Sequence, residues 1–590
     1  MKINFSKPKF RKKIRAKSKQ ITLLGESINK HIDRHIFRRW SNLRNARRFA
    51  IGWVSLLLIL IAGVLMQSYM LPRHYLELAP VAGGYYTEGD VGNFDNGNPI
   101  YATGSVDVSA SKLIFASLLT YDNNGNLKGD LAKSWKMEPN GRIFHVQLRP
   151  NLKWHDGQPL TADDIVFTYQ TIKNPQAKSP LMSGWKGIKV EKVDAENVIF
   201  TLQSPYVPFP NNLTTGIIPK HILGNIKPEN LRADSFNTKK LIGSGPFIFK
   251  SGSDNDSGTN KEIKLLANKN YHLSPPKLDG FSIFTYKNSE SLKSALSRHE
   301  IISAGGLRIK DTDITAPEKT AFIQNSATML FLKNTSPNLV DVKVRQALTR
   351  GTKITDINNK VGYDAVAVRE PLLSDQMGYN DDFWQQSYNK EAAEKLLDEA
   401  GWLKVDGKQY RQKDGKELTL KLVSENNDTY PALATEIQKQ WAQIGVKLDE
   451  SFVTADQITQ TYIPNHEYDV FLYGINIGKD PDVYAYWHSS QAVAGSSRLN
   501  LSEYKSTTSD IALESARSRA NSDLRAAKYK PFLAAWKNDA PAIGLFQPRY
   551  LYLSNQPVYN IDNNRSISNP EDRFNNVNDW MINTSKVQKK

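Results

Sequence analysis

The sequence predicts a mixed α/β protein of two or more lobes, preceded by one N-terminal transmembrane helix. Three observations lead to this prediction. The chain has 590 residues, which is too long for one small hydrophobic core. Strand and helix patterns alternate along it without the strict rhythm of a parallel βαβ protein. An uncharged run of 24 residues lies near the start, at 49–72.

The first 48 residues form a basic tail that we expect in the cytoplasm. They hold 16 of the 77 Lys and Arg residues and only two acids, Glu26 and Asp33. Residues 21–48 are predicted as an amphipathic helix on the inner leaflet, where each basic residue adds roughly 1 kcal/mol of attraction to anionic lipids. Alternatively, these charges only enforce the topology. The remaining chain is nearly neutral, which argues against nucleic-acid binding because phosphate contacts need clustered Lys and Arg.

The uncharged run at 49–72 is typical of a transmembrane signal anchor. About 20 apolar residues cross a bilayer as a helix. Basic residues are concentrated before its start, at Arg44, Arg47 and Arg48, and few follow its end, which places the N-terminus in the cytoplasm and the body outside the cell membrane. A cleaved signal peptide has a small-x-small site, and MQSYM at 66–70 offers none. Cleavage is the main alternative, and a buried core helix is another.

The body after residue 84 shows separate strand and helix signals. Thr161 can cap a helix, with Asp163 and Asp164 at its positive end. Gly401 and Gly445 are good stops for two amphipathic helices. A polar stretch at 251–260 between apolar runs predicts a hairpin with a long loop. The predicted strands are 142–148, 198–202, 281–286, 418–423 and 470–473, and the two amphipathic helices are 391–401 and 433–444.

The sequence shows no catalytic or metal-binding motif and indicates no cofactor. The absence of cysteine excludes disulfides, thiol catalysis and thiolate ligands. No P-loop, GxGxxG or GxSxG pattern occurs, and His466 lacks the second histidine that a zincin helix needs. His155 and Asp156 fit a turn before a capped helix better than a catalytic pair. The acid-rich stretches 122–125 and 254–256 lack EF-hand spacing and are expected to be surface turns.

A glycine- and aromatic-rich segment at 468–489 is the predicted ligand site. A strand ends at Tyr473 and a Gly/Asn/Asp/Pro loop follows, and α/β proteins place ligands at such loops. Tyr, Trp and Asn there can stack on a ligand and hydrogen-bond its backbone. Alternatively, the aromatic residues are core and 480–482 is only a turn. The predicted ligand-binding residues of this half are Tyr473, Gly474, Ile475, Asn476, Asp480, Trp487 and Asn500.

Short motifs occur in a fixed order between about residue 84 and about residue 580. They are LLTYD at 118–122, LAKSW at 131–135, NGR at 140–142, LRP at 148–150, KWHDGQPLTADDIVF at 153–167, IGSGPF at 242–247, VRQAL at 344–348, AEKLLDEAGW at 393–402, IGV at 444–446, DPD at 480–482 and DAP at 539–541. In content and order they resemble the peptide-binding branch, family 5, of ABC-transporter solute-binding proteins. The motif at 153–167 is the most specific.

This resemblance implies a two-lobed, periplasmic-binding-protein-like fold of the class with an extra domain. A hinge closes the lobes over a ligand, and no bond is made or broken. The solute-binding domain spans 81–582. The implied divisions are domain I at 81–116, 236–326 and 548–582, domain II at 117–235, and domain III at 327–547.

The resemblance also implies site residues. In peptide binders of this family, an aspartate after the late strand pairs with the amino terminus of the peptide. The nearest counterpart here is Asn476, and a neutral amide cannot compensate a buried ammonium as a carboxylate does. A longer or blocked peptide, or another solute, is therefore also considered. Thr103 and Gly104 fall where the other lobe of the family faces the ligand.

The sequence therefore predicts a monomeric, membrane-anchored binding protein that delivers peptides to an ABC permease. A transmembrane tether would keep it beside the permease at high effective concentration. Within the binding class, the alternative is a non-peptide solute such as a glycan fragment or nucleoside. From other classes, the alternatives are an anchored cell-surface hydrolase or a structural protein, which no motif supports. A DNA-uptake binder is the least favoured.

Overall fold

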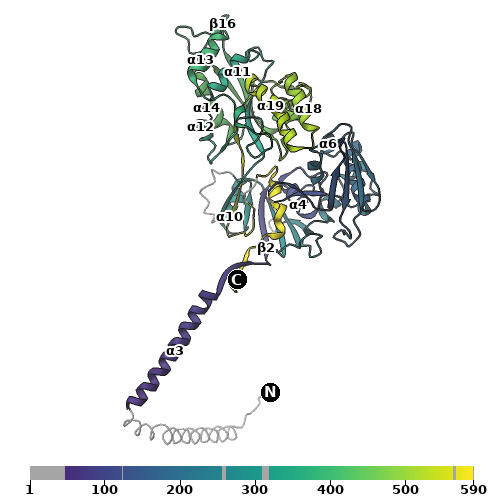
Figure 1. Ribbon diagram of the computed structural model, residues 1–590, viewed down its shortest axis with the longest axis vertical. Coiled ribbons are helices and arrows are strands. Elements are labelled where there is room, and N and C mark those ends of the chain that lie inside the picture. Colours follow the sequence, from purple (N-terminus) through teal and green to yellow (C-terminus); the bar gives the residue numbers. More distant parts are fainter. Residues whose placement is uncertain (1–46, 123, 255–260, 308–317, 563–565, 589–590) are drawn as a thin grey trace, which may run out of the picture. The chain divides into compact units, whose positions relative to one another are not determined.

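The computed structural model describes residues 47–588, except 123, 255–260, 308–317 and 563–565 (Figure 1). The predicted basic tail, with its inner-leaflet helix and lipid contacts, lies outside the described residues except for Arg47 and Arg48, as does most of the turn at 254–256. The chain divides into two compact units. One holds Met1–Ala79 together with Thr584–Lys590, and the other is Pro80–Asn583.

The first unit contains one long apolar helix, α3 (Arg47–Tyr75). Its stretch Phe49–Met70 has 22 residues, a mean hydropathy of 2.6 and no buried share. At 1.5 Å per residue this stretch is about 33 Å long, which matches the apolar thickness of a bilayer. The predicted N-terminal apolar helix is thus confirmed by length and composition. After it, β1 (Leu76–Val81) pairs with β23 (Asn583–Gln588) in a two-stranded sheet.

The second unit is built on three larger sheets. The first has seven strands in the order β13-β22-β12-β2-β11-β10-β9, and β2 runs parallel to both β11 and β12. Its strands are β2 (Tyr85–Val91), β9 (Phe247–Asp254), β10 (Lys261–Ala267), β11 (Gly280–Tyr286), β12 (Ser303–Gly305), β13 (Glu318–Ile323) and β22 (Arg549–Ser554). Helices α4 (Ser105–Ile114), α10 (Ser289–Ser297) and η8 (Pro570–Asp579) accompany it.

A four-stranded antiparallel sheet, in the order β5-β6-β8-β7, forms the second. Its strands are β5 (Ala132–Met137), β6 (Ile143–Leu148), β7 (Lys189–Lys192) and β8 (Asn197–Thr201), with the hairpin β3 (Leu119–Tyr121) and β4 (Leu127–Gly129) beside them in sequence. The associated helices are α5 (Ala162–Lys173), η2 (Pro175–Ala177), α6 (Met182–Trp185), η3 (Phe209–Thr214), α7 (Lys220–Leu223), α8 (Pro228–Leu231) and α9 (Phe236–Lys239).

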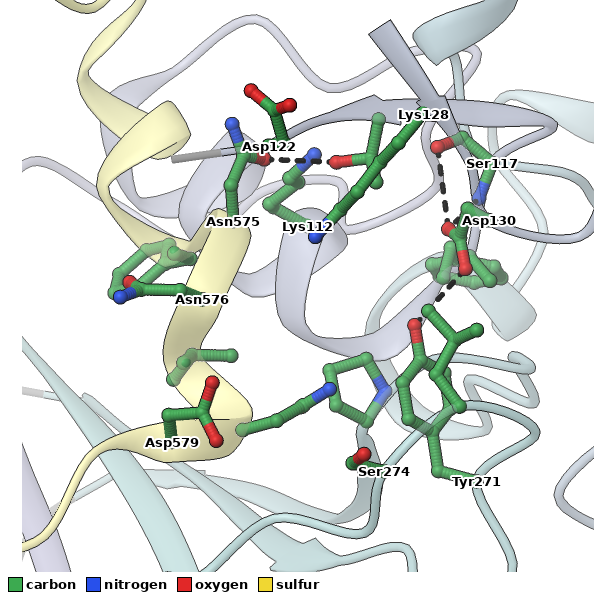
Figure 2. A pocket seen from close by; sticks show the side chains of 18 of the residues that line it. Lys112, Ser117, Asp122, Lys128, Asp130, Tyr271, Ser274, Asn575, Asn576 and Asp579 are labelled. Carbon is green, nitrogen blue, oxygen red and sulfur yellow. Dashed lines mark hydrogen bonds between the residues drawn. The ribbon is translucent and has the colours of Figure 1, made fainter. Parts of the chain in front are cut away.

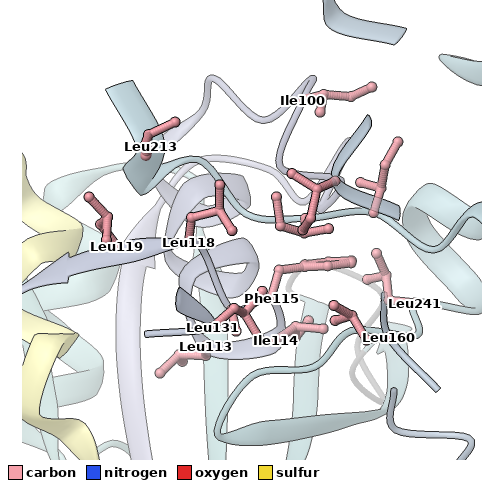
Figure 3. Packing of buried hydrophobic residues seen from close by; sticks show 14 of the residues in the cluster. Ile100, Leu113, Ile114, Phe115, Leu118, Leu119, Leu131, Leu160, Leu213 and Leu241 are labelled. Atoms are coloured by element: carbon pink, nitrogen blue, oxygen red, sulfur yellow. The ribbon is translucent and has the colours of Figure 1, made fainter. Parts of the chain in front are cut away.

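These two sheets share one hydrophobic core. Tyr86 and Phe281 of the seven-stranded sheet lie in the same buried cluster as Phe144 and Val198 of the four-stranded sheet. Figure 3 shows the part of this cluster around the end of α4, where Phe115 packs among leucine and isoleucine side chains from several chain segments. Because a shared core resists relative motion, we treat both sheets as one body, the first lobe.

The third sheet has six strands in the order β15-β21-β14-β20-β18-β19 and forms the second lobe. Its strands are β14 (Ser326–Leu332), β15 (Val366–Ala367), β18 (Thr419–Glu425), β19 (Lys447–Val453), β20 (Val470–Asn476) and β21 (Ala542–Gln547), with the hairpin β16 (Gln412–Lys413) and β17 (Lys416–Glu417). Its helices are α11 (Val342–Arg350), α12 (Ile354–Asn358), η5 (Asp381–Phe383), α13 (Lys390–Glu399), α14 (Tyr430–Ala442), α15 (Ala455–Gln457), η6 (Ile458–Tyr462), α16 (Ile463–Asn465), α17 (Tyr484–Trp487), η7 (Ser489–Gln491), α18 (Thr507–Arg517) and α19 (Ser522–Asp539).

Strand β20 explains why this sheet is covered on both faces. Its side chains alternate between two buried clusters: Val470 and Leu472 join one, and Phe471 and Ile475 join the other. Successive side chains of a strand point to opposite faces, so each face carries its own layer of helices. The amino-acid sequences of the central strands are therefore nearly continuous apolar runs.

The local signals in the sequence agree well with these elements. All five predicted strands form, as β6, β8, β11, β18 and β20. Thr161 caps α5 in a capping box with Asp164, as its position predicted. Gly401 and Gly445 follow α13 and α14 at φ values of +83° and +82°, the left-handed geometry that glycine adopts without strain. The three domain divisions stay predictions.

One buried carboxyl predicts a pH-dependent stability. Glu370 is fully buried, Asn380 N donates to it at 3.3 Å, and burial raises its pKa from 4.5 to about 8. Because this pKa is higher in the folded chain, stability is lost as the pH rises from about 4.5 to about 8. We expect Glu370→Gln to remove that loss, so its advantage over the wild type should grow by about 1 kcal/mol or more between about pH 5 and about pH 8. Urea denaturation at both pH values measures the free energy of unfolding of the variant and the wild type. A difference between them that is the same at both pH values would contradict this account.

Candidate functional site

The end of β20 reaches the surface where the sequence predicted a ligand site. Tyr473 and Gly474 are half-buried, Ile475 is buried, and Asn476 is exposed. Tyr473 stacks on Phe471, with ring centroids 5.1 Å apart. A side chain at Gly474 would approach the Tyr430 hydroxyl to 3.1 Å, so glycine leaves room above the strand.

Asn476 links the second lobe to the C-terminal segment of the first. Its Nδ2 donates to Ser568 O at 3.0 Å and to Asn569 Oδ1 at 3.2 Å. Its Oδ1 accepts from Gly478 N at 3.0 Å, which holds the loop after the strand. The predicted residue therefore lies at the junction of the lobes, with its amide engaged by the protein.

The acidic residues of the following loop are paired with arginines of the second lobe. Asp480 receives two hydrogen bonds from Arg525, at 2.6 Å and 2.5 Å, in a fork geometry. Asp482 receives one from Arg517 Nε at 3.1 Å, and burial raises its pKa. Because its oxygens are occupied by a guanidinium, Asp480 holds the loop in place in this structure.

Trp487 and Asn500 lie in the interior of the second lobe. Trp487 is fully buried, stacks on Phe331 and packs edge-on against Trp536. Asn500 is fully buried, and its Nδ2 donates to His488 O and Tyr504 O at 3.1 Å and 2.8 Å. Neither side chain reaches solvent here, so both support the loop that carries the site.

Thr103 and Gly104 are exposed and precede α4 directly. The loop before them is fixed by Asp107, whose Oδ1 accepts from Asp95 N at 2.9 Å and Asn96 N at 3.0 Å. The pair therefore stands on a loop of the first lobe that Asp107 holds in place, and its contact with a ligand stays a prediction.

A cavity of about 260 Å³ in the first lobe lies next to both predicted halves of the site, and we call it the Asn569 cavity. Pro99 and Ala102 come from the loop that carries Thr103, and Asn569 is the residue that accepts from Asn476. The cavity is lined by Pro99, Ala102, Val108, Ser111, Lys112, Phe115, Leu181, Thr214, Thr215, Gly216, Ser117, Asn569, Glu571 and Asp572. Segments that are far apart in the sequence thus line the same cavity.

The charged side chains that line this cavity differ in their hydrogen bonds and ion pairs. Asp572 Oδ2 accepts from Ser568 N and Asn569 N, both at 3.0 Å, and so caps η8. Glu571 has no hydrogen bond or ion pair to another residue in the described part of the chain. Burial raises the pKa of Glu571, and repulsion by Asp572 adds to this effect. Lys112, at the end of α4, supplies a positive charge.

Arg517 forms a contact between the lobes near this site. Its guanidinium carbon lies 4.7 Å from the ring centre of Tyr206 in the first lobe and 4.1 Å from that of Tyr484 in the second. Its carbonyl accepts from Val207 N at 2.9 Å. We call this set, with Asp482, the Arg517 latch.

The chain was compared with known protein families and structures. The model of the bacterial extracellular solute-binding proteins, family 5, matches residues 126–496, which is more than half of the chain. The chain belongs to this family. It is thus a solute-binding protein of the kind that serves ABC transporters, extracytoplasmic and without enzymatic activity, as the motifs predicted.

Relatives of this solute-binding protein match it over most of their length. The oligopeptide-binding protein AppA of Bacillus subtilis is 29% identical over 512 residues, covering 82% of this chain and 92% of AppA. The structure of that AppA in complex with a nonapeptide has a TM-score of 0.67 at 26% identity, covering 86% and 100%. NikZ of Campylobacter jejuni in complex with Ni(L-His) has a TM-score of 0.70 at 27% identity, covering 84% and 99%. The predicted fold is confirmed.

Two further cavities of the solute-binding protein lack the Thr103 loop. One of about 420 Å³ surrounds Asp130, which accepts from Ser117 N at 2.9 Å and Tyr271 OH at 3.0 Å (Figure 2). The predicted site residues themselves line neither this cavity nor the Asn569 cavity. The other, of about 340 Å³, lies beside Tyr430 and Thr328, and Thr328 pairs with Gly474 across the sheet. The Asn569 cavity alone among these touches the Thr103 loop and the partner of Asn476.

Sequence reasoning missed the C-terminal contribution to the site. Asn569, Glu571 and Asp572 follow the pattern of a capped helix start, with Pro570 at its first position, and this pattern indicates structure only. Leu181 and Thr214 carry no local signal. Only the topology of the solute-binding protein brings these residues to the Thr103 loop.

Proposed function

We propose that this solute-binding protein binds peptides in the Asn569 cavity and delivers them to an ABC permease by closing its lobes. The observation that carries the proposal is a cavity lined by the loop before Thr103 and by Asn569 of the C-terminal segment, to which Asn476 of the second lobe is hydrogen-bonded. Hydroxyl groups of Thr214 and Thr215 and the amide of Asn569 can hydrogen-bond a peptide main chain. A site that hydrogen-bonds the main chain of a peptide can hold peptides with many different side chains.

The lining favours a peptide over a glycan fragment. Sugar rings are bound on exposed aromatic faces, as aromatic side chains supply large apolar contact area. Phe115 is the aromatic residue among those lining the Asn569 cavity, and only 3% of it is exposed. The structure of Bacillus subtilis AppA in complex with a nonapeptide supports the same choice.

Mass spectrometry of molecules that co-purify with the full chain tests this function. The expected result is a set of peptides that is released when the protein is denatured. Recovery of sugars, nucleosides or a metal chelate such as Ni(L-His) without any peptide would overturn the peptide assignment. The variant Asn569→Asp adds a negative charge to the cavity, so it should co-purify with a different set of peptides from the wild type.

We also propose that α3 anchors the protein in the cell membrane, with the binding unit outside and the tail able to contact anionic lipids. The apolar stretch Phe49–Met70 supports it, and a removed signal sequence is the competing explanation. The protein should stay in the membrane pellet after alkaline carbonate extraction, with residues 1–48 attached. Release into the supernatant, with a new N-terminus after residue 70, would contradict the anchor.

A further inference from the structure

We propose that Glu571 binds the positively charged amino terminus of the ligand. The inference rests on the proposed peptide binding and names the residue that selects the charged end. A free amino terminus needs a carboxylate when it leaves water, because burying an unpaired ammonium is unfavourable. Asn476, at the position where the sequence suggested such a partner, is neutral and is bonded to Ser568 and Asn569.

Three consecutive charged residues of η8 have different surroundings. Arg573 turns inward and pairs with Glu88, and both are fully buried. Asp572 caps its own helix through Ser568 N and Asn569 N. Glu571 lines the cavity, and within the described residues no donor from another residue is bonded to it. It is therefore the carboxylate that remains available to a ligand.

The local charges favour a cation at this point. Glu571 is half-buried; burial and the negative charge of Asp572 raise its pKa, and the charges of Lys112 and Arg573 oppose this more weakly. Arg573 is already paired with Glu88, and no ion pair joins Lys112 to Glu571 within the described part of the chain. An ammonium group in the cavity would supply the missing partner.

The test uses a synthetic library of short peptides without lysine, one half with free amino ends and the other N-acetylated. The full chain retains peptides from the mixture, and mass spectrometry gives the ratio of free to acetylated forms. The wild type should prefer the free form roughly tenfold or more, as expected for a hydrogen bond between charged groups. Glu571→Gln should bring this ratio close to one while retention of acetylated peptides is unchanged.

Glu391→Gln is the matched control. Glu391 is also a glutamate in the first turn of a helix, α13, but it is exposed and far from the cavity in sequence. It should keep the wild-type ratio. An undiminished preference in Glu571→Gln, or no preference in the wild type, would overturn the inference and leave peptide binding intact. Failure of both peptide forms to bind the wild type would instead overturn the proposed function, and the inference with it.

Discussion

Replacing Arg573 with methionine is expected to lower the free energy of unfolding by about 3–5 kcal/mol, because it leaves a buried charge without its partner. Glu88 and Arg573 are both fully buried and form an ion pair within the first lobe. Arg573 also donates to Pro570 O at 2.6 Å and to Ser109 Oγ at 3.3 Å. Urea denaturation followed by tryptophan fluorescence measures the loss.

The double variant Glu88→Gln/Arg573→Met is the control for this explanation. It removes both charges, so it should recover at least about 1 kcal/mol of the loss seen in Arg573→Met. An equal loss in both variants would show that packing of the arginine chain matters and the charge does not. Because Arg573 holds the segment that carries Glu571 and Asn569, Arg573→Met should also weaken peptide binding.

Replacing Arg517 with alanine is expected to raise the apparent Kd for peptides by about tenfold. Arg517 of the second lobe is held by Asp482 and Tyr484 of the same lobe and lies over the ring of Tyr206 in the first lobe, so the closed lobes lose the cation–π contact that joins them. A ligand that binds only the closed form is held less tightly when that form is less populated. Isothermal titration calorimetry with one peptide from the retained set measures the change.

Two variants separate closure from local stability. Tyr206→Ala removes the contact from the first lobe and leaves the Arg517–Asp482 pair in place, so it should weaken binding in the same direction. Arg519→Ala, an exposed arginine two residues further on, should have no effect. If Tyr206→Ala and Arg517→Ala weaken binding independently, so that their effects add fully, the latch would not be a single unit.

The sequence predicted the local elements because their signals are local. The capping pair Thr161 and Asp164, and the glycine after α13, each specify one end of a helix through groups a few residues apart. β20 was recognised because an apolar run led into a loop of Gly, Asn and Asp. These features need no knowledge of the rest of the chain.

The candidate site could be predicted only in part, because its walls come from distant segments. Thr103 and Asn476 are exposed and stay predicted ligand contacts, but Trp487 and Asn500 are buried, as aromatic and amide side chains near a strand end often are. Glu571 lies more than 450 positions after Thr103, and the capped helix that contains it gives no sign of its neighbours. Such proximity follows from topology alone.

Closure of the lobes around a peptide is the central claim, and a distance measurement between the lobes tests it most directly. The chain has no cysteine, so spin labels can be placed at Lys136→Cys in β5 and Lys395→Cys in α13, both exposed positions. Pulsed electron paramagnetic resonance on the full chain should show a shorter and narrower distance distribution when peptide is added, and Arg517→Ala should need more peptide to reach it. An identical distribution with and without saturating peptide would contradict the account.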